Sequence, residues 1–229
     1  KAEDEKELAY KINSLAPKYF SEIIKDYGGD LLHISSDYVF DGKKGSPYLP
    51  NDKKAPLGIY GSTKSIGEDF IIENLSDINK GHIIRTSWLL SPYGNNFALK
   101  ILKKLDHENQ LKIIYDQIGS PTSACTLAKV CWQTIILKSK GINIPKIMHY
   151  SDAGIASWYD IAITIEEIGR ELGLIKKEVK IIPILSSSYP SKVKRPKYSV
   201  LNTKETIDKL FIDSIPWRKS LKDLLNKLI

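Results

Sequence analysis

The stretch Gly28-Gly29-Asp30-Leu31-Leu32-His33-Ile34-Ser35-Ser36-Asp37 decides the fold. Before it, residues 5–27 carry apolar side chains at helical spacing, with Pro17 expected to kink or break the helix and the two glycines expected to end it. After the glycines, residues 31–34 form a short, largely apolar run with the length of a buried strand. A helix, a glycine turn and a buried strand in this order indicate an α/β fold.

The same pattern repeats outward along the chain. Residues 82–86 and 111–115 predict further buried strands, and helical patterns lie at residues 60–75, 96–106 and 126–138. Strands that alternate with helices favour right-handed crossovers. The sequence therefore predicts a Rossmann-like parallel sheet with helices on both faces.

The pattern changes near residue 145. Beyond it we expect a strand at residues 146–150, a helix at residues 157–172 and a second strand at residues 179–182. A loop rich in Ser, Pro and Lys follows, and two helices at residues 203–210 and 218–228 close the chain. We therefore predict a main domain over residues 1–145 and a smaller lobe over residues 146–229, packed against the carboxyl edge of the sheet. Ligands usually bind in clefts at such junctions.

Composition excludes several classes of protein. The chain has 229 residues, of which 42% are hydrophobic, which is enough for a sizeable core. Its apolar runs are too short to span a bilayer, so we expect no membrane segment. Residues 1–6 are charged and do not resemble a secretory signal, so we expect a cytoplasmic protein. Cys125 and Cys131 are six positions apart, which does not suit a metal site or a redox pair.

The formal net charge of +7 is densest in one late segment, where Lys192, Lys194, Arg195 and Lys197 gather. This cluster is either a phosphate-facing surface or a solvated, lysine-rich face. We expect no nucleic-acid partner, because no recognised nucleic-acid-binding signature accompanies the charge. The four histidines are scattered without a helical pair or a set of neighbouring carboxylates, so we expect no metal site.

Tyr60 and Lys64 are four residues apart at the start of a predicted helix and so lie on one face of it. A nearby ammonium group stabilises a phenolate, so this spacing predicts a lowered tyrosine pKa and proton exchange with a substrate oxygen. By itself the pair is also common as surface decoration. Ser36, at the end of the strand before this helix, adds a hydroxyl that can bind the same substrate oxygen, unless it satisfies only local backbone groups.

Four stretches carry a resemblance to a known family: HISSDYVFDG at residues 33–42, YGSTKSIGE at residues 60–68, RTSWLLSPYGNNF at residues 85–97 and DQIGSPTSA at residues 116–124. Together they resemble, in order, the dTDP-4-dehydrorhamnose reductases of the extended short-chain dehydrogenase type. Further matches run to RPKYSVLNT near Arg195. The resemblance implies reduction of the 4-keto group of dTDP-4-dehydro-6-deoxy-L-mannose to dTDP-L-rhamnose with NADPH or NADH.

The resemblance also implies roles for individual residues. Ser36, Tyr60 and Lys64 match the family's catalytic set: Ser36 binds the carbonyl oxygen, Tyr60 donates the proton, and Lys64 binds the nicotinamide ribose and tunes Tyr60. The resemblance and the chemistry of the side chains together suggest substrate contacts for five further residues, namely Tyr38, Trp88, Asn95, Asn96 and Arg195. Trp88 offers a flat apolar face to the sugar or is a core aromatic, and Arg195 suits a diphosphate because its forked donors match phosphate oxygens.

In these terms residues 1–145 correspond to the C-terminal part of a Rossmann-type NAD(P)-binding domain. Residues 146–229 are the main substrate-binding lobe, with contributions from the segments near 88–97 and 116–124. The turn at residues 116–124 is equally open to a structural reading. The resemblance is compatible with a homodimer.

The sequence departs from the family in one respect. The family begins with a strand, a glycine-rich turn and a helix whose N-terminus binds the cofactor pyrophosphate. No Gly-x-x-Gly-x-x-Gly or Gly-x-Gly-x-x-Gly pattern occurs here. We therefore expect the first strands of the sheet to be missing from these 229 residues, and the fragment alone to be inactive. Ser36 in place of the commoner threonine keeps the hydroxyl.

Two rival functions stay open at this point. A nucleotide-sugar epimerase or dehydratase shares the fold and the Tyr/Lys pair, but a dehydratase needs two adjacent acids after the strand-end hydroxyl. Here Asp37 is followed by Tyr38, which favours a reductase. The other rival is a non-catalytic, NADP-binding regulatory subunit of the same fold. The joint presence of Ser36, Tyr60 and Lys64 disfavours it.

Overall fold

The computed structural model describes residues 1–191 and 193–229. The chain forms two compact units, each assembled from three separate segments. The first unit comprises residues 1–87, 129–150 and 191–212, and the second comprises residues 88–128, 151–190 and 213–229. Among the described residues, no helix is both long and apolar enough to cross a membrane.

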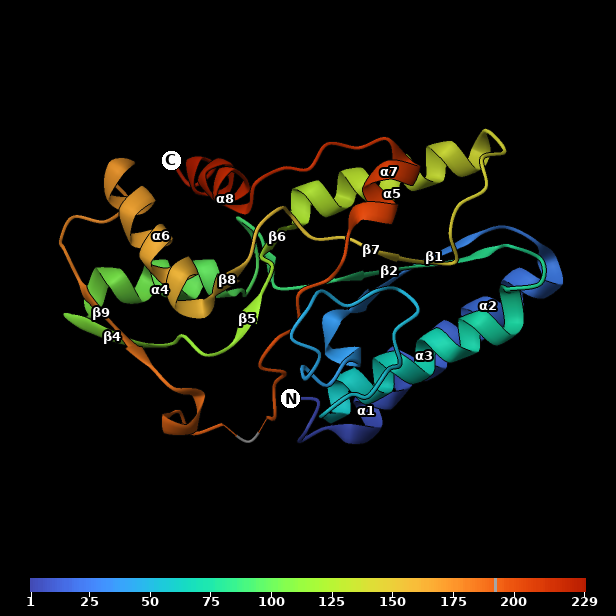
Figure 1. Ribbon diagram of the computed structural model, residues 1–229, viewed down its shortest axis with the longest axis horizontal. Coiled ribbons are helices and arrows are strands. Elements are labelled where there is room, and N and C mark those ends of the chain that lie inside the picture. Colours follow the sequence, from blue (N-terminus) through green and yellow to red (C-terminus); the bar gives the residue numbers. More distant parts are fainter. Residues whose placement is uncertain (192) are drawn as a thin grey trace. The chain divides into compact units, whose positions relative to one another are not determined.

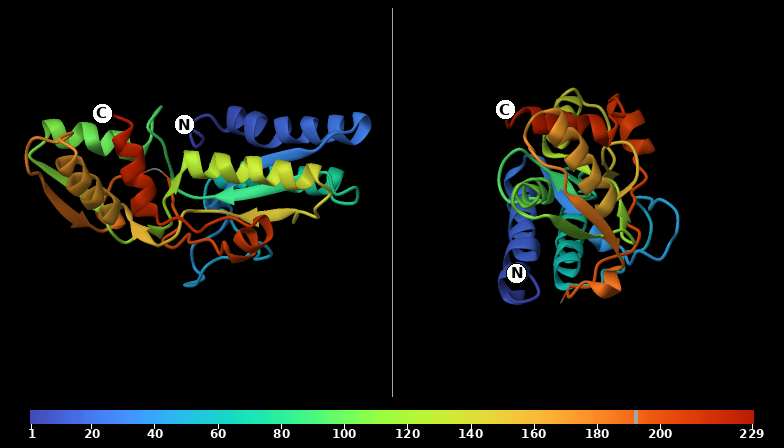
Figure 2. Two further views of the ribbon diagram at one scale, coloured as in Figure 1. Left: turned by 90° about the horizontal axis from the view of Figure 1, so that it is seen from above. Right: turned by 90° about the vertical axis from the view of Figure 1, so that its left-hand side faces the viewer.

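A parallel three-stranded sheet organises the first unit. Its strands are β1 (Leu31–Ser36), β2 (Gly81–Thr86) and β7 (Ile147–His149), in the order β1-β2-β7. Ser36 at the end of β1 is aligned with Thr86 at the end of β2. The strands run in one direction (Figure 2, left). Their carboxyl ends therefore lie along the same edge of the sheet.

Helices cover both faces of this sheet. In Figure 1, α2 (Ala16–Tyr27) and α3 (Ile59–Leu75) lie on one side of the strands, and α5 (Ala124–Ser139) and α7 (Lys204–Leu210) lie on the other. Ile71 and Leu75 of α3 pack on Ile83 of β2. Burial of these apolar side chains fixes α3 against the sheet.

The N-terminal helical segment is continuous but irregular. It consists of α1 (Lys6–Tyr10), a π-helical turn (Lys11–Leu15) and α2. The predicted irregularity near Pro17 is therefore present, but as a wide turn just before the proline. Pro17 itself lies in the first turn of α2 and has no N–H to donate to a carbonyl of the preceding turn, which agrees with the irregular hydrogen bonding there.

The second unit contains three small sheets. The strand β3 (Leu89–Leu90) pairs in parallel with β6 (Thr122–Ser123), and β4 (Gln110–Ile114) pairs in parallel with β9 (Lys180–Ile184). The short strands β5 (Ile118–Gly119) and β8 (Ala156–Ser157) pair antiparallel.

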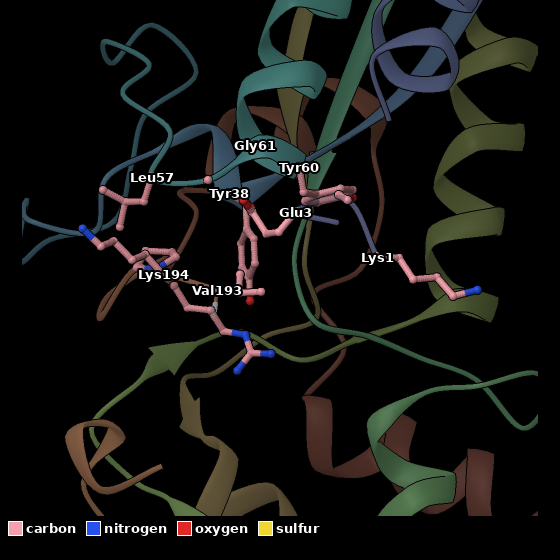
Figure 3. A pocket seen from close by; sticks show the side chains of 12 residues that line it. Lys1, Glu3, Tyr38, Leu57, Tyr60, Gly61, Val193 and Lys194 are labelled. Carbon is pink, nitrogen blue, oxygen red and sulfur yellow. The ribbon is translucent and has the colours of Figure 1, made fainter. Parts of the chain in front are cut away.

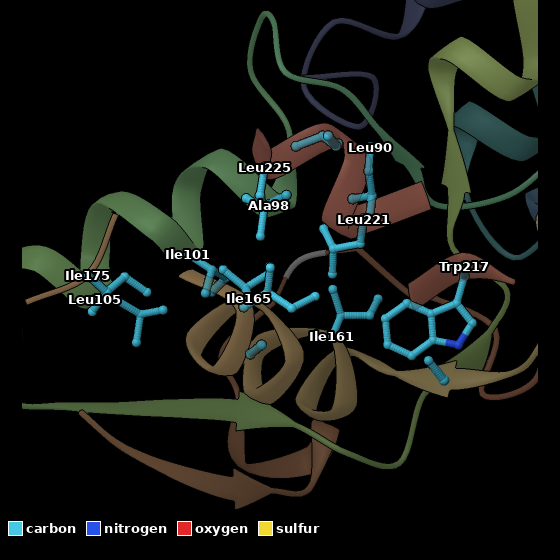
Figure 4. Close-up of a cluster of buried hydrophobic side chains, with 14 of the residues drawn as sticks. Leu90, Ala98, Ile101, Leu105, Ile161, Ile165, Ile175, Trp217, Leu221 and Leu225 are labelled. Carbon is cyan, nitrogen blue, oxygen red and sulfur yellow. The ribbon is translucent and has the colours of Figure 1, made fainter. Parts of the chain in front are cut away.

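The core of the second unit lies among α4 (Phe97–His107), α6 (Trp158–Glu171) and α8 (Trp217–Asn226). Figure 4 shows apolar side chains from these helices meeting, among them Ile101, Ile165 and Leu221. Two short 3-10 turns, Asp37–Val39 in the first unit and Ser186–Ser188 in the second, complete the regular structure.

Two predictions about organisation were wrong. The strand near residues 111–115 exists as β4, but it pairs with β9 and not with the main sheet. The division at residue 145 also differs from the observed one, because β7 adds to β2 and so belongs to the first unit. Local patterns reveal a strand but not its pairing partner, since pairing depends on contacts between distant segments.

Candidate functional site

The site begins where β1 ends. Ser36 is buried, and its Oγ accepts a hydrogen bond from the backbone N–H of Tyr38 (3.1 Å). The same Oγ donates to Oδ1 of Asp37 (2.9 Å). Ser36 thus caps the 3-10 turn Asp37–Val39, in the way that serine commonly caps turns. This local bonding holds the Ser36 hydroxyl at the carboxyl edge of the sheet.

The start of α3 lies close against that turn. Gly58 precedes the helix without a capping side chain, and Oε1 of Glu3 accepts from the backbone N–H of Ile59 instead (2.7 Å). A Cβ atom on Gly61 would lie 2.1 Å from the carbonyl oxygen of Tyr38. Only glycine permits this approach, so Gly61 sets the separation between the helix and the strand end.

This approach brings Tyr60 to Ser36. The Tyr60 hydroxyl is hydrogen-bonded to the Ser36 side chain. The ring of Tyr60 meets the ring of Tyr38 edge to face, with 6.0 Å between ring centroids. Tyr60 is 38% exposed, so a ligand can reach it.

The pKa of Tyr60 lies above its ordinary value. Burial is the main cause, the hydrogen bond from Ser36 opposes it, and the charge of Asp37 adds to it. The prediction that Lys64 lowers this pKa was wrong for this structure, because removal of the phenol from water dominates. A phenol with a raised pKa is protonated at neutral pH, which is the state that a proton donor needs.

Lys64 lies one turn further along α3. Its Nζ donates to the backbone carbonyl of Ile34 (2.8 Å), two residues before Ser36 on β1. Burial lowers the pKa of Lys64, and the Glu68 carboxylate opposes that shift. An ammonium group has three donors, and Ile34 uses one of them.

A buried ion pair connects α3 to the neighbouring strand β2. Arg85 of β2 binds Glu68 of α3 with two hydrogen bonds, from Nε to Oε1 (2.9 Å) and from Nη2 to Oε2 (2.8 Å). Both side chains are almost fully buried, and Lys54 lies 3.4 Å from the same carboxylate. Burial alone would raise the pKa of Glu68, but the hydrogen bonds and charge of Arg85 outweigh it and hold that pKa below its usual value.

A pocket of about 310 Å³ opens beside these residues. Tyr38 and Tyr60 stand next to each other in it, and Lys194 belongs to another part of its wall (Figure 3). Arg195 also lines the pocket, and its side chain is hydrogen-bonded to Tyr38. The pocket is therefore lined both by the phenols of Tyr38 and Tyr60 and by Lys194 and Arg195 of the basic cluster. Lys192 of the predicted basic cluster lies outside the described residues.

The structure brings Ser36, Tyr60 and Lys64 together, and Tyr38 and Arg195 line the adjoining pocket. Trp88 belongs to the second unit. It is buried and stacks on Trp158, with ring centroids 3.7 Å apart, and Gly119 lies against its indole ring. These contacts match the packing alternative that the sequence left open for Trp88.

Asn95 and Asn96 also belong to the second unit. Asn95 is exposed. Asn96 caps α4, since its Oδ1 accepts from the backbone N–H of Leu99 (3.3 Å). Its Nδ2 donates to the carbonyl oxygen of Ser91 (2.8 Å). Most of the hydrogen-bonding capacity of Asn96 is therefore used within its own segment, which leaves Asn95 as the more accessible amide.

The polar turn at residues 116–124 also makes hydrogen bonds within the second unit. Asp116 accepts from the backbone and the hydroxyl of Ser186 (2.7 and 2.8 Å), and Gln117 accepts from the indole N–H of Trp158 (3.1 Å).

Within residues 1–191 and 193–229, no group of three or more His, Cys, Asp or Glu side chains could hold a metal ion.

Sequence reasoning missed two residues of this site. Asp37 was considered only as half of an acid pair, although its carboxyl group touches the Ser36 hydroxyl. The other residue is Gly61, whose signal is its place inside a helix, where a glycine costs about 1 kcal/mol relative to alanine. The close contact with Tyr38 supplies the reason for this glycine.

Comparisons with known proteins agree with one another. The family model described as "RmlD substrate binding domain" matches residues 1–229. The chain is 33% identical to the dTDP-4-dehydrorhamnose reductase of Escherichia coli strain K12 over 228 residues, which cover 100% of this chain and 75% of that protein.

Two solved structures are also similar. The crystal structure of a dTDP-4-dehydrorhamnose reductase from Clostridium acetobutylicum has a TM-score of 0.88 and 35% identity, and the match covers 99% of this chain and 76% of that one. The dTDP-4-dehydrorhamnose reductase of Bacillus anthracis, solved in complex with NADP, has a TM-score of 0.87 and 30% identity, with coverage of 99% and 75%.

Proposed function

Because the chain belongs to the family of the RmlD substrate binding domain, we propose that it reduces the 4-keto group of dTDP-4-dehydro-6-deoxy-L-mannose to give dTDP-L-rhamnose, with NADPH or NADH as the reductant. One observation carries the proposal for the chemistry. The Tyr60 hydroxyl is hydrogen-bonded to Ser36 at the carboxyl edge of the sheet, and Lys64 lies one helical turn away.

The residues divide the work at the substrate oxygen. Ser36 donates a hydrogen bond to O4 of the sugar, which stabilises the negative charge that develops there. Tyr60 gives its proton to O4, and its raised pKa keeps that proton in place until the charge develops. Lys64 then stabilises the phenolate that Tyr60 becomes. Its attachment to the Ile34 carbonyl holds the ammonium group on the correct side of α3.

The residues present fit the nicotinamide end of the cofactor. Lys64 keeps donors beyond the one used by Ile34, and the Tyr60 hydroxyl lies on the same face of α3. These two side chains would hold the nicotinamide ribose. The bound cofactor supplies the hydride that is added to C4 of the sugar.

The pocket wall suits the substrate's charge. Arg195 carries the forked donors that match diphosphate oxygens, and its bond to Tyr38 fixes where those donors lie. Lys194 adds a second positive charge to the same wall. We therefore assign the diphosphate to Arg195, and a contact with the sugar to Tyr38.

The second unit is our candidate for the main substrate-binding lobe. Within it, the exposed amide of Asn95 is the best placed for a sugar hydroxyl. Asn96 supports the loop that carries Asn95, and Trp88 contributes packing through its stacking on Trp158. The chemistry then resides in the first unit.

The dehydratase alternative loses support at Tyr38. A dehydratase needs a carboxylate base beside its acid, and the residue after Asp37 is a phenol. Burial, followed by the charge of Asp37, raises the pKa of Tyr38 above its ordinary value, so this phenol does not act as a base near neutral pH.

We also propose a cytoplasmic location and a free nucleotide sugar as the partner, without nucleic acid. Both cysteines are free thiols, as expected in a reducing compartment. A homodimer is part of this proposal, and light scattering of the purified full-length protein tests it: a mass of one chain would contradict it.

The function itself is tested by following NADPH oxidation with the full-length protein. We expect turnover with the dTDP-linked 4-keto sugar, and stronger competition by dTDP than by UDP. No oxidation of NADPH or NADH with that sugar would contradict the proposed reaction. Equal or stronger competition by UDP would instead contradict the assigned nucleotide and point to an epimerase-like substrate.

A further inference from the structure

Asp37 is a buried carboxyl group that the proposed mechanism does not use. It is 2% exposed, and Oδ2 makes no hydrogen bond to any residue in the described ranges. Its side-chain partners are two hydroxyl groups, from Ser36 and Ser199. No cation among the described residues is among the groups that shift its pKa. A carboxylate in such a place is costly, because hydroxyl groups replace water only in part.

More groups can form a hydrogen bond with the Ser36 hydroxyl than it has bonding positions. A hydroxyl group offers one proton and two lone pairs. The backbone N–H of Tyr38 occupies one lone pair, which leaves the proton and one lone pair for Asp37 and for the Tyr60 and substrate side. Whether Asp37 uses the proton or the lone pair of Ser36 therefore decides whether Ser36 can donate a hydrogen bond to the substrate.

The two protonation states of Asp37 have opposite effects. An ionised carboxylate only accepts, so it takes the Ser36 proton and leaves Ser36 unable to donate to O4 of the sugar. A protonated carboxyl group donates through the same 2.9 Å contact, and the Ser36 proton is then free for O4. Reduction needs the second arrangement, since O4 gains negative charge in the transition state.

We propose that Asp37 is a positioning residue whose protonated carboxyl group donates to Ser36 Oγ and thereby directs the single Ser36 hydroxyl proton toward O4 of the substrate. This inference rests on the proposed reductase function. Burial raises the pKa of Asp37 to about 7, against the hydrogen bonds from Ser199 and Ser36, so both states are populated near neutral pH.

Two phenols face Asp37, and neither titrates near pH 7. Tyr38 on its own turn and Tyr60 from α3 both have pKa values raised above the ordinary tyrosine value by burial. Arg195, from the loop after β9, is hydrogen-bonded to Tyr38. A loss of turnover centred near pH 7 is therefore assigned to Asp37 and not to the proton donor.

The test is the pH dependence of turnover, measured between pH 5.5 and 9.5 at saturating substrate and NADPH. For the unmodified full-length protein we expect turnover to fall about tenfold as pH rises from 6 to 8. In Asp37→Asn, the amide N–H donates to Ser36 at every pH. We expect this variant to keep, at every pH in the range, a turnover close to that of the parent below pH 6, and so to lack the fall between pH 6 and 8.

Two further variants separate positioning from simple structural support. Asp41→Asn changes a carboxyl group on the same segment that bonds to Lys43 and Tyr48, and it should keep the parental midpoint. Ser36→Ala removes the hydroxyl through which Asp37 acts, so its turnover should be low and independent of pH between 6 and 8.

The possible results distinguish failure of the proposed role of Asp37 from failure of the proposed reductase function. If the parent does not oxidise NADPH with the sugar, the proposed reaction fails and the pH profile is not reached. If the parent turns over but its rate is level from pH 6 to 8, the role of Asp37 is wrong. The same conclusion follows if Asp37→Asn keeps the parental fall.

Discussion

Arg85 of β2 and Glu68 of α3 form a two-point ion pair that is almost fully buried, one helical turn beyond Lys64. The pair joins α3, which carries the proposed catalytic residues Tyr60 and Lys64, to the middle strand of the sheet. The position of Lys64, and through it that of Tyr60, therefore depends on a contact that is buried away from solvent.

Removal of one partner of this pair should be strongly destabilising. We expect Glu68→Gln to lower the free energy of unfolding by about 3 to 5 kcal/mol, because Arg85 would keep a buried, uncompensated charge. Urea denaturation of the full-length protein measures it. The exposed pair of Arg218 and Glu167 is the control, and Glu167→Gln should cost less than about 1 kcal/mol. Equal losses for both variants would contradict a special role for the buried pair.

Tyr60→Phe should separate catalysis from binding. The change removes only the hydroxyl, so turnover should fall by roughly two or more powers of ten while substrate binding stays within about threefold. Steady-state kinetics with titration of dTDP measures both quantities. Turnover equal to that of the parent would remove Tyr60 from the mechanism.

Gly61→Ala should disturb the site without touching a catalytic group. The added Cβ would lie 2.1 Å from the Tyr38 carbonyl oxygen, so α3 must move away from the strand end. We expect turnover to fall at least tenfold, although alanine favours a helix more than glycine does. The adjacent Ser62→Ala is the control and should change turnover less than twofold. A Gly61→Ala enzyme with parental turnover would show that the close approach is unnecessary.

The buried carboxyl group of Asp37 should also make stability depend on pH. Its pKa of about 7 in the folded state lies above the ordinary 3.8, so the folded state retains the proton more strongly than the unfolded state. Stability from this group is complete below pH 4 and is lost as pH rises through 7. The stability of Asp37→Asn relative to the parent should therefore increase between pH 5 and 8.

Asp41 provides a matched comparison, because its pKa is shifted in the opposite direction. Hydrogen bonds from the Lys43 N–H and Tyr48 hydroxyl hold the pKa of Asp41 below its ordinary value, so its contribution is fully present at both pH 5 and pH 8. The stability difference between Asp41→Asn and the parent should then be the same at the two pH values. Urea midpoints at pH 5 and 8 check both variants, and parallel behaviour of the two would contradict the buried state of Asp37.

The sequence predicted most elements of the fold, because helices and buried strands leave local signals. The strand after Gly28 and Gly29 ends at Ser36, and the helix of Tyr60 spans Ile59–Leu75, close to the predicted bounds. The pairing of β4 with β9 was not predictable in this way, because the composition of a strand does not show which other strand it pairs with. Pairing follows from the packing of segments far apart in the chain.

The site shows the same limit. Spacing identified Tyr60 and Lys64, but it could not give the sign of the tyrosine's pKa shift, because that sign depends on how far the ring is removed from water. It could not reveal Asp37 either, since an aspartate in a sequence does not show whether its carboxyl group is solvated. Gly61 left a signal, a glycine within a helix, whose cause appears only in the close contact with Tyr38.

The most direct measurement of the central claim follows the label from deuterated cofactor. The full-length protein is incubated with the dTDP-linked 4-keto sugar and NADPH that carries deuterium at the transferring position, and the product is examined by NMR. We expect one deuterium on C4 of a 6-deoxy sugar, because the hydride is added to the carbon whose oxygen Tyr60 protonates. A sugar without deuterium at C4, or with the label at C5 or C6, would contradict it.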